Sequence, residues 1–99
     1  MIIYNVTVKV APEVNAEWLN WMRKEHIPEV MKTGLFMDHR IFRLLDQAET
    51  DGVTYAIQYT CNTIRDYELY ARDHAPRLQQ NHHARYPNNV AFRTILELI

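Results

Sequence analysis

Apolar and polar side chains alternate in four stretches of this 99-residue chain. The pattern is clearest in IIYNVTVKV, residues 2–10, where one face collects Ile2, Tyr4, Val6, Val8 and Val10. Alternation with a period of two recurs over residues 35–46, 53–61 and 90–99, and it is typical of half-buried β-strands. Charged residues fall on both faces of the 35–46 stretch, which favours a position at the edge of a sheet. We therefore expect four strands.

The residues after the first strand have helical spacing. Asn15 is the expected N-cap, and Thr33-Gly34 is the expected end of the helix. Pro28 lies inside it and should kink it, because a proline removes one helical hydrogen bond. One broad arc of this helix should pack on the sheet, and it comprises Val14, Trp18, Trp21, Met22, His26 and Val30.

A second helix is expected from Asn62 or Thr63, which would cap it, to the turn at residues 86–89. Like the first helix it contains a proline, Pro76. The two helices also share related strings, EHIPEV at 25–30 and DHAPRL at 73–78, and an aromatic pair spaced by three residues precedes each string. The chain therefore resembles a twofold repeat of a strand–helix–strand unit.

The order βαββαβ with two similar halves is typical of the split βαβ, or ferredoxin-like, arrangement. We predict one α+β domain over residues 1–99, with a four-stranded antiparallel sheet. Right-handed crossovers place the first and third strands in the centre and both helices on one face. A polar hairpin loop is expected over residues 47–52.

The face without helices carries polar residues among apolar neighbours, and no third helix remains to cover it. Such a surface is too apolar to be fully exposed and too polar for an ordinary core. We therefore expect a homodimer in which two sheets face each other across a partly polar space. The polar members of this face are Asn5, Thr7, Thr54, Gln58 and Thr60.

The composition limits which kinds of partner and which cellular compartment we expect for this protein. The formal net charge of −1 provides no basic field for a nucleic-acid backbone. No apolar run approaches the length of a membrane span. Met1 leads directly into the first strand without a signal peptide, and the single Cys61 fits a reducing compartment, so we expect a cytoplasmic protein. Phosphate-binding loops and GxSxG motifs are absent from the sequence.

His26 and His74 are the candidate catalytic residues, with Glu25 beside the first. An imidazole next to an acid could act as a general base or a proton shuttle. Alternatively, each ring bonds a backbone carbonyl freed by the proline two residues later. Their symmetric placement favours the structural role, because a fold repeat duplicates structural devices more readily than active sites.

Other chemistry has weaker support. The five histidines lack metal-ligand spacing, so we expect no metal and no cofactor, and haem held by His26, His74 or His82 is disfavoured equally. Cys61 is more plausible as a small buried side chain than as a reactive thiol. An aromatic set either lines a flat apolar pocket or belongs to the core, and it comprises Trp18, Trp21, Tyr55, Tyr59, Tyr67 and Tyr70.

Four strings carry a further signal: MIIYNVTV, EWLNWMRKEHIPEVMKTGLF, VTYAIQYT and HAPRLQQNHHARYPNNVAFRT. They span essentially the whole chain and resemble a family of small bacterial proteins catalogued as a domain of unknown function. That family is similar to the dimeric α/β barrel superfamily, which includes cofactor-free monooxygenases, muconolactone isomerase, haem-degrading enzymes and effector domains of transcription factors. The resemblance implies the fold and a homodimer, and it implies no catalytic residue.

Three functions follow as hypotheses. The first is a dimeric barrel that binds a small apolar or aromatic ligand. The second is a non-enzymatic dimer that acts in interaction or sensing. The third is an enzyme similar to a cofactor-free monooxygenase or isomerase that uses His26.

Overall fold

The computed structural model describes residues 1–45, 48 and 51–99. The expected 47–52 loop and the end of the 35–46 strand lie partly outside these residues. The chain forms, in order, β1 (Ile2–Val10), a 3₁₀ turn (Pro12–Val14), α1 (Asn15–Trp21), a π-helical turn (Met22–His26), α2 (Ile27–Lys32), β2 (Asp38–Arg43), β3 (Val53–Cys61), α3 (Ile64–Asp73), α4 (Ala75–Arg85) and β4 (Val90–Glu97).

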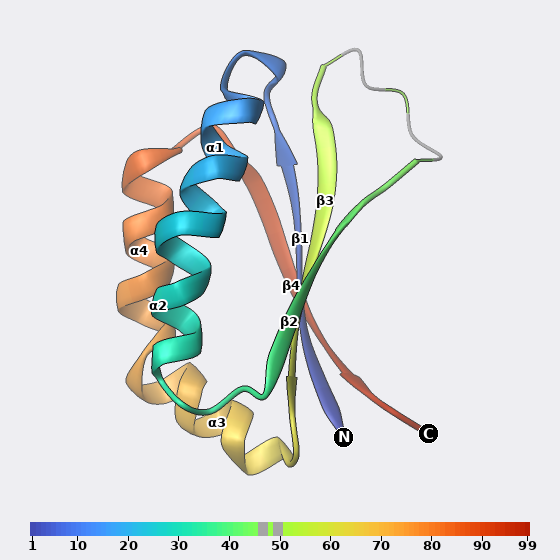
Figure 1. Cartoon of the computed structure of the whole chain (residues 1–99), viewed down its shortest axis with the longest axis vertical. Helices are drawn as coiled ribbons and strands as arrows, with labels where there is room; N and C mark the ends of the chain where they lie inside the picture. The colour runs from blue at the N-terminus through green and yellow to red at the C-terminus, as the bar shows by residue number, and fades with distance from the viewer. Residues whose placement is uncertain (46–47, 49–50) are drawn as a thin grey trace.

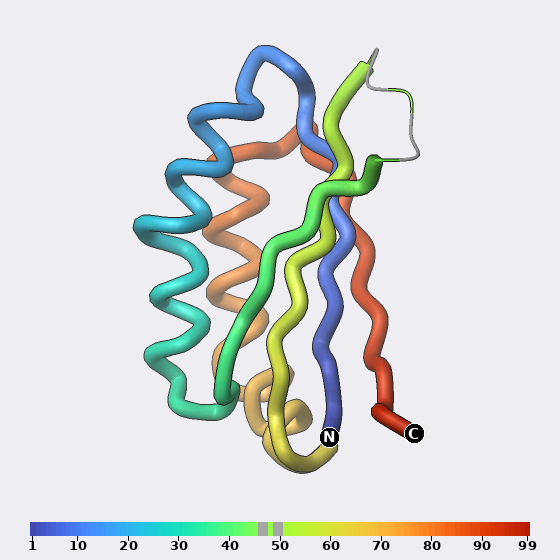
Figure 2. Tube along the Cα trace, turned by 45° about the vertical axis from the view of Figure 1, so that its right-hand side comes forward, coloured from blue at the N-terminus to red at the C-terminus, as the bar shows by residue number. Residues whose placement is uncertain are grey.

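The sheet has the order β2-β3-β1-β4, and each neighbouring pair is antiparallel. The long strands β1 and β3 therefore lie in the centre, and the helices cover one face (Figure 1). The sheet is strongly twisted, as the crossing strand traces in Figure 2 show. This confirms the predicted ferredoxin-like α+β fold and the edge position of the second strand.

Pro28 does not produce the simple kink that we expected. Instead α1 and α2 continue in one direction through the π-helical turn Met22–His26 (Figure 1). The N–H of Ile27 donates to the carbonyl of Met22, five residues earlier, so the turn holds one extra residue. This wider turn directly precedes the proline, whose ring would otherwise press on a carbonyl of the preceding turn. The extra residue shifts the helical phase, so Ile27 is buried and Glu25 is exposed.

Pro76 has a different setting, and the prediction of one continuous second helix was wrong. The helix breaks at His74, whose φ of −128° and ψ of −38° are not helical. Pro76 then lies in the first turn of α4, where a missing N–H costs no hydrogen bond. The two halves of the chain therefore accommodate their prolines differently: a wider helical turn precedes Pro28, and a break between two helices precedes Pro76.

The helix ends were predicted in part. Thr63 caps α3, because its hydroxyl accepts a hydrogen bond from the N–H of Asp66. Gly34 has a φ of 76°, the left-handed conformation expected after a helix. Asn15 does not cap α1, because the 3₁₀ turn leads directly into the helix. Its side chain instead accepts a hydrogen bond of 2.6 Å from the hydroxyl of Tyr55.

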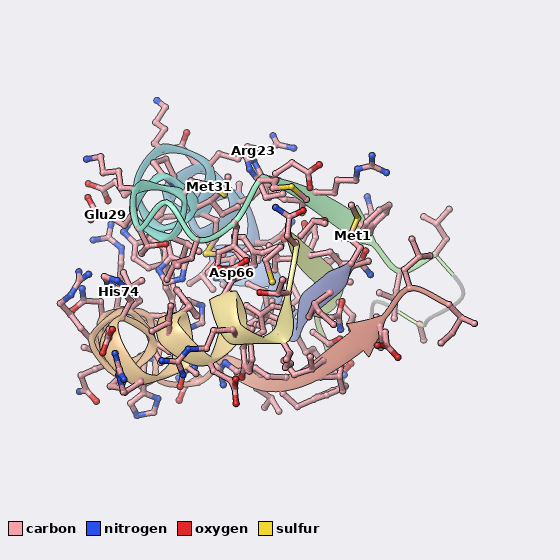
Figure 3. All side chains as sticks on the ribbon, turned by 90° about the horizontal axis from the view of Figure 1, so that it is seen from below. Met1, Arg23, Glu29, Met31, Asp66 and His74 are labelled. Atoms are coloured by element: carbon pink, nitrogen blue, oxygen red, sulfur yellow. The ribbon has the colours of Figure 1, made fainter. Side chains whose placement is uncertain are left out.

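The core lies between the sheet and the helices, and side chains fill this layer in Figure 3. One part of it is an aromatic group, in which the ring of Tyr4 lies 5.8 Å from Tyr59 and 6.0 Å from Phe36. Phe36 also packs edge-on against Tyr70 at 4.9 Å. Such ring pairs stabilise the fold beyond the area they bury. Among the described residues, no helix is long and apolar enough to cross a membrane.

The face of the sheet without helices has a polar row and an apolar row. In the polar row, Gln58 donates to the amide oxygen of Asn5 at 3.3 Å, and the Asn5 amide donates to Thr94 at 3.2 Å. The next row is defined by direct strand pairing, and it runs Phe42, Ala56, Thr7 and Phe92. Both phenylalanines are exposed. Exposed phenylalanines in a contiguous row are unusual for a surface that stays in water.

Candidate functional site

A small cavity lies between the inner face of the sheet and the helices. Its volume is about 30 Å³, which is room for one or two water molecules. Apolar side chains form most of its wall, with polar side chains among them. The polar and aromatic members of the wall are Tyr4, Trp18, His26, Tyr59, Tyr70, Gln79, His82 and Arg93.

His82 reaches this cavity from α4. Its Nε2 accepts a hydrogen bond of 3.0 Å from the indole Nε1–H of Trp18, which is fully buried in α1. An accepting Nε2 carries no proton, so the neutral ring holds its proton on Nδ1. Burial and, after it, the positive charge of Arg93 together lower the pKa of His82 to about 4. The imidazole of His82 is therefore neutral at pH 7.

His26 comes from the π-helical turn. Its ring lies 5.1 Å from the ring of Trp21 and 5.7 Å from that of His82. Burial lowers the pKa of His26 to about 4, and the nearby His82 and Arg93 act in the same direction. The site thus contains two adjacent neutral imidazoles, and π-helical turns are often found where function requires such a displaced side chain.

Three phenols complete the polar wall. Burial raises the pKa of Tyr4, Tyr59 and Tyr70, so all three stay protonated at neutral pH. Hydrogen bonding to Gln79 and Arg93 acts in the opposite direction on Tyr4. The cavity therefore offers hydroxyl groups and imidazoles, which donate and accept hydrogen bonds, in an otherwise apolar setting.

The cavity opens between α4 and β4. A surface groove of about 330 Å³ runs there, and Gln79, His82 and Arg93 line both the groove and the cavity. A larger groove of about 730 Å³ lies on the outer side of the helices, and His26 is one of the residues that line it. His26 thus lies between the interior and the helical surface.

Only some of the six predicted aromatic residues line the cavity. Trp18, Tyr59 and Tyr70 line the cavity. Tyr55 packs on Trp18 from outside the cavity at 5.1 Å, and Tyr67 packs on Tyr4 at 5.3 Å. Trp21 lies in the outer groove, where the guanidinium of Arg85 stands 5.5 Å above its ring.

The predicted catalytic residues also occupy different places. His74 is at the break between α3 and α4, where its ring stacks on Tyr70 at 6.3 Å (Figure 3 shows its position). Glu25 is exposed and lines the outer groove. Within the described chain, neither His26 nor His74 forms a direct side-chain hydrogen bond with a backbone carbonyl. The repeated motif therefore does not create two equivalent sites.

Gln79 and Arg93 are not among the residues that the sequence predicts for a site, and His82 is considered there only as a haem ligand. The sequence holds one signal for Arg93, because it shares the phase of Ala91 on the last strand, and Ala91 faces the core. His82 falls on the buried arc of its helix, but spacing alone does not show that it meets His26. Their proximity depends on how the two helices pack.

Neither the thiol of Cys61 nor a group of metal-ligating side chains provides a reactive centre among the described residues. Cys61 is buried, and its thiol contacts the carbonyl oxygen of Thr63 at 3.4 Å. Burial raises the pKa of this thiol, which opposes reactivity at neutral pH. Among the residues that the structure describes, no three His, Cys, Asp or Glu side chains are grouped so that they could hold a metal ion.

The sequence model of a family described as a domain of unknown function (DUF4286) matches residues 1–99. The chain belongs to this family. Among curated proteins, none matches it by sequence. The family membership agrees with the resemblance drawn from the sequence strings.

Solved structures share the fold of this DUF4286 protein. An EthD family protein from Bacillus halodurans has a TM-score of 0.70 at 13% identity, with 100% of both chains covered. A dimeric ferredoxin-like protein from an uncultured marine organism has 0.67 at 8%, covering 99% of this chain and 94% of its own. SnoaB, a cofactor-independent oxygenase from Streptomyces nogalater, has 0.65 at 12%, covering 98% and 92%. At these identities the likeness shows the fold alone.

Proposed function

We propose that this protein binds a small apolar or aromatic molecule in the cavity between its sheet and helices. The observation that carries the proposal is the convergence of two neutral imidazoles and three phenols on an otherwise apolar cavity with a surface opening. Ligand sites commonly combine apolar walls with a few placed polar groups. A structural core alone requires neither the paired histidines nor the opening.

The volume of the cavity sets a condition on binding. About 30 Å³ does not hold an aromatic ring, so side chains must move when a ligand enters. Gln79 and Arg93 are at the opening, and Arg93 is exposed, so these two side chains can swing into the groove. Binding then enlarges the existing cavity from its open end, and the buried Trp18 stays in place.

The same proposal includes a homodimer in the cytoplasm, formed through the bare sheet face. The exposed Phe42 and Phe92 end a row whose middle members are Ala56 and Thr7. Pairing two such faces would bury both phenylalanines, and each would contribute about 1.5–3 kcal/mol if fully buried. The polar row around Asn5 has its side chains bonded to one another, which lowers the cost of covering it.

A catalytic use of His26 is the second candidate function. Within the described residues its ring makes no hydrogen bond, while His82 is held by Trp18. A neutral imidazole with a free nitrogen beside a ligand pocket can accept a hydrogen bond from the ligand, and with its pKa lowered to about 4 it can take a proton only from an acidic group. A chemistry of this kind would need no metal ligand from the protein.

The ligand proposal is tested by titrating benzamide and phenol while following the indole N–H resonances of both tryptophans by NMR. The Trp18 resonance should shift with saturation, because Trp18 lines the cavity. Ala91→Phe, which fills the wall near the opening, should remove the shift while its spectrum stays folded. An unchanged Trp18 resonance with benzamide, phenol and benzoate alike would remove the basis for the proposal.

A further inference from the structure

Arg93 has an unusual position for a charged residue. It pairs with Val6 of the central strand β1, so its side chain leaves the sheet on the helix-covered side. It lines both the cavity and the groove at the opening. In the described part of the chain, no carboxylate lies within ion-pair distance of its guanidinium. A guanidinium has five N–H donors, and the hydrogen bond to the hydroxyl of Tyr4 engages only part of them, so the others remain for a ligand.

The charge of Arg93 acts on the cavity itself. It lowers the pKa of four wall residues, Tyr4, His26, Tyr70 and His82, although burial is the largest influence on each. Both histidines are neutral at pH 7, whereas Arg93 is positively charged and influences all four pKa values. A positive potential in a partly desolvated site favours an anion over a neutral molecule of the same shape.

A second donor lies in the surface groove. The side-chain nitrogen of Asn89 is buried and finds no hydrogen-bond acceptor among the described residues. Asn89 lines the same surface groove as Arg93. Buried polar atoms are rarely left without a partner, so this unpaired donor in the groove that Arg93 also lines indicates a place for an acceptor group.

We propose that the ligand is a small aromatic acid, with its anionic group held at the opening by Arg93 and its ring in the cavity between the tyrosines and the histidines. This rests on the proposed function and adds the chemical class of the ligand. The guanidinium fork matches the two oxygens of a carboxylate, and a bidentate contact also fixes the direction in which the ring points.

Benzoate and benzamide test this directly, because they share shape and differ in charge. Each is titrated into the intact protein, and the indole N–H resonance of Trp18 reports binding. The indole of Trp21 is an internal reference, since Trp21 does not line the cavity. Arg93→Gln removes the charge, and Arg65→Gln is the matched control on the exposed side of α3.

Benzoate should bind the native protein and the Arg65→Gln variant about tenfold or more tightly than benzamide, as expected for a charge-assisted contact. Arg93→Gln should reduce this ratio to about one without weakening benzamide. Equal affinity of both probes for the native protein would overturn the aromatic-acid assignment and leave the cavity proposal standing. Failure of both probes to shift Trp18 would overturn both.

Discussion

The indole of Trp18 donates its Nε1–H to Nε2 of His82 at 3.0 Å, across 64 positions of the sequence. This contact joins α1 to α4 over the inner face of the sheet. It holds His82 as a neutral ring beside His26, whose own ring is 5.7 Å away. This hydrogen bond between two helices thus fixes the position of His82 in the cavity wall.

Trp18→Phe should weaken the fold and alter the site together. It removes the donor to His82 and shrinks a fully buried side chain, so we expect a loss of about 1–3 kcal/mol in the free energy of unfolding. The pKa of His82 should rise, because Nε2 is then free to take a proton. Urea denaturation and NMR titration of the ring measure the two effects. Trp21→Phe is the control, and an unchanged His82 titration in Trp18→Phe would contradict this role.

Stability should depend on pH between 4 and 6.5. In the folded protein the pKa values of His26 and His82 are about 4, whereas the ordinary histidine value is 6.5. Between these limits the unfolded chain binds more protons, so the free energy of unfolding falls as the pH is lowered, and it is fully retained above 6.5. Each histidine contributes at most about 1.4 kcal/mol per pH unit, and partial solvent access reduces the share of His82.

The double variant with glutamine at both positions isolates this effect, because His26→Gln and His82→Gln remove the two titrating rings. Chemical denaturation at several pH values should show a smaller slope than in the native protein. The same slope in both proteins would mean that other groups cause the pH dependence.

His26→Ala and His74→Ala should have different effects. His26 packs against Trp21 and His82 in the wall of the cavity, so its loss should cost stability and change ligand binding. His74 contacts Tyr70 at a helix break outside the cavity, and its replacement should leave ligand affinity unchanged. Thermal melting and the Trp18 titration compare them. Equal loss of stability with intact binding in both variants would support the symmetric structural role instead.

The fold was predictable because the strongest patterns belong to its centre. Alternation in residues 2–10 and 53–61 indicates the two central strands, which pair over their full length. The π-helical turn was not predictable, because periodicity assumes a constant number of residues per turn. One extra residue before Pro28 moves Ile27 inward and Glu25 outward. The meeting of His26 with His82 depends on helix packing, which no spacing within one helix reports.

If two sheet faces pair in a homodimer, a charged side chain placed on that face should separate the two subunits. Phe92→Lys places an ammonium group in the apolar row, so it should convert the dimer to a monomer. Ile64→Lys makes the same change at an exposed residue of α3 and should leave the dimer intact. Light scattering should give about twice the 11.8 kDa chain mass for the native protein and for Ile64→Lys. A native protein that is monomeric in dilute solution would contradict the pairing.

The most direct measurement of ligand binding is an intermolecular NOE spectrum of the protein with benzamide. We expect contacts from the ring protons of benzamide to the methyl groups of Val8, Ile57 and Leu78, which line the cavity. These contacts should vanish in the Ala91→Phe variant, in which the new ring fills the cavity near its opening. Contacts confined to the bare sheet face, at Phe42 or Phe92, or no contacts at saturating benzamide, would contradict the central claim.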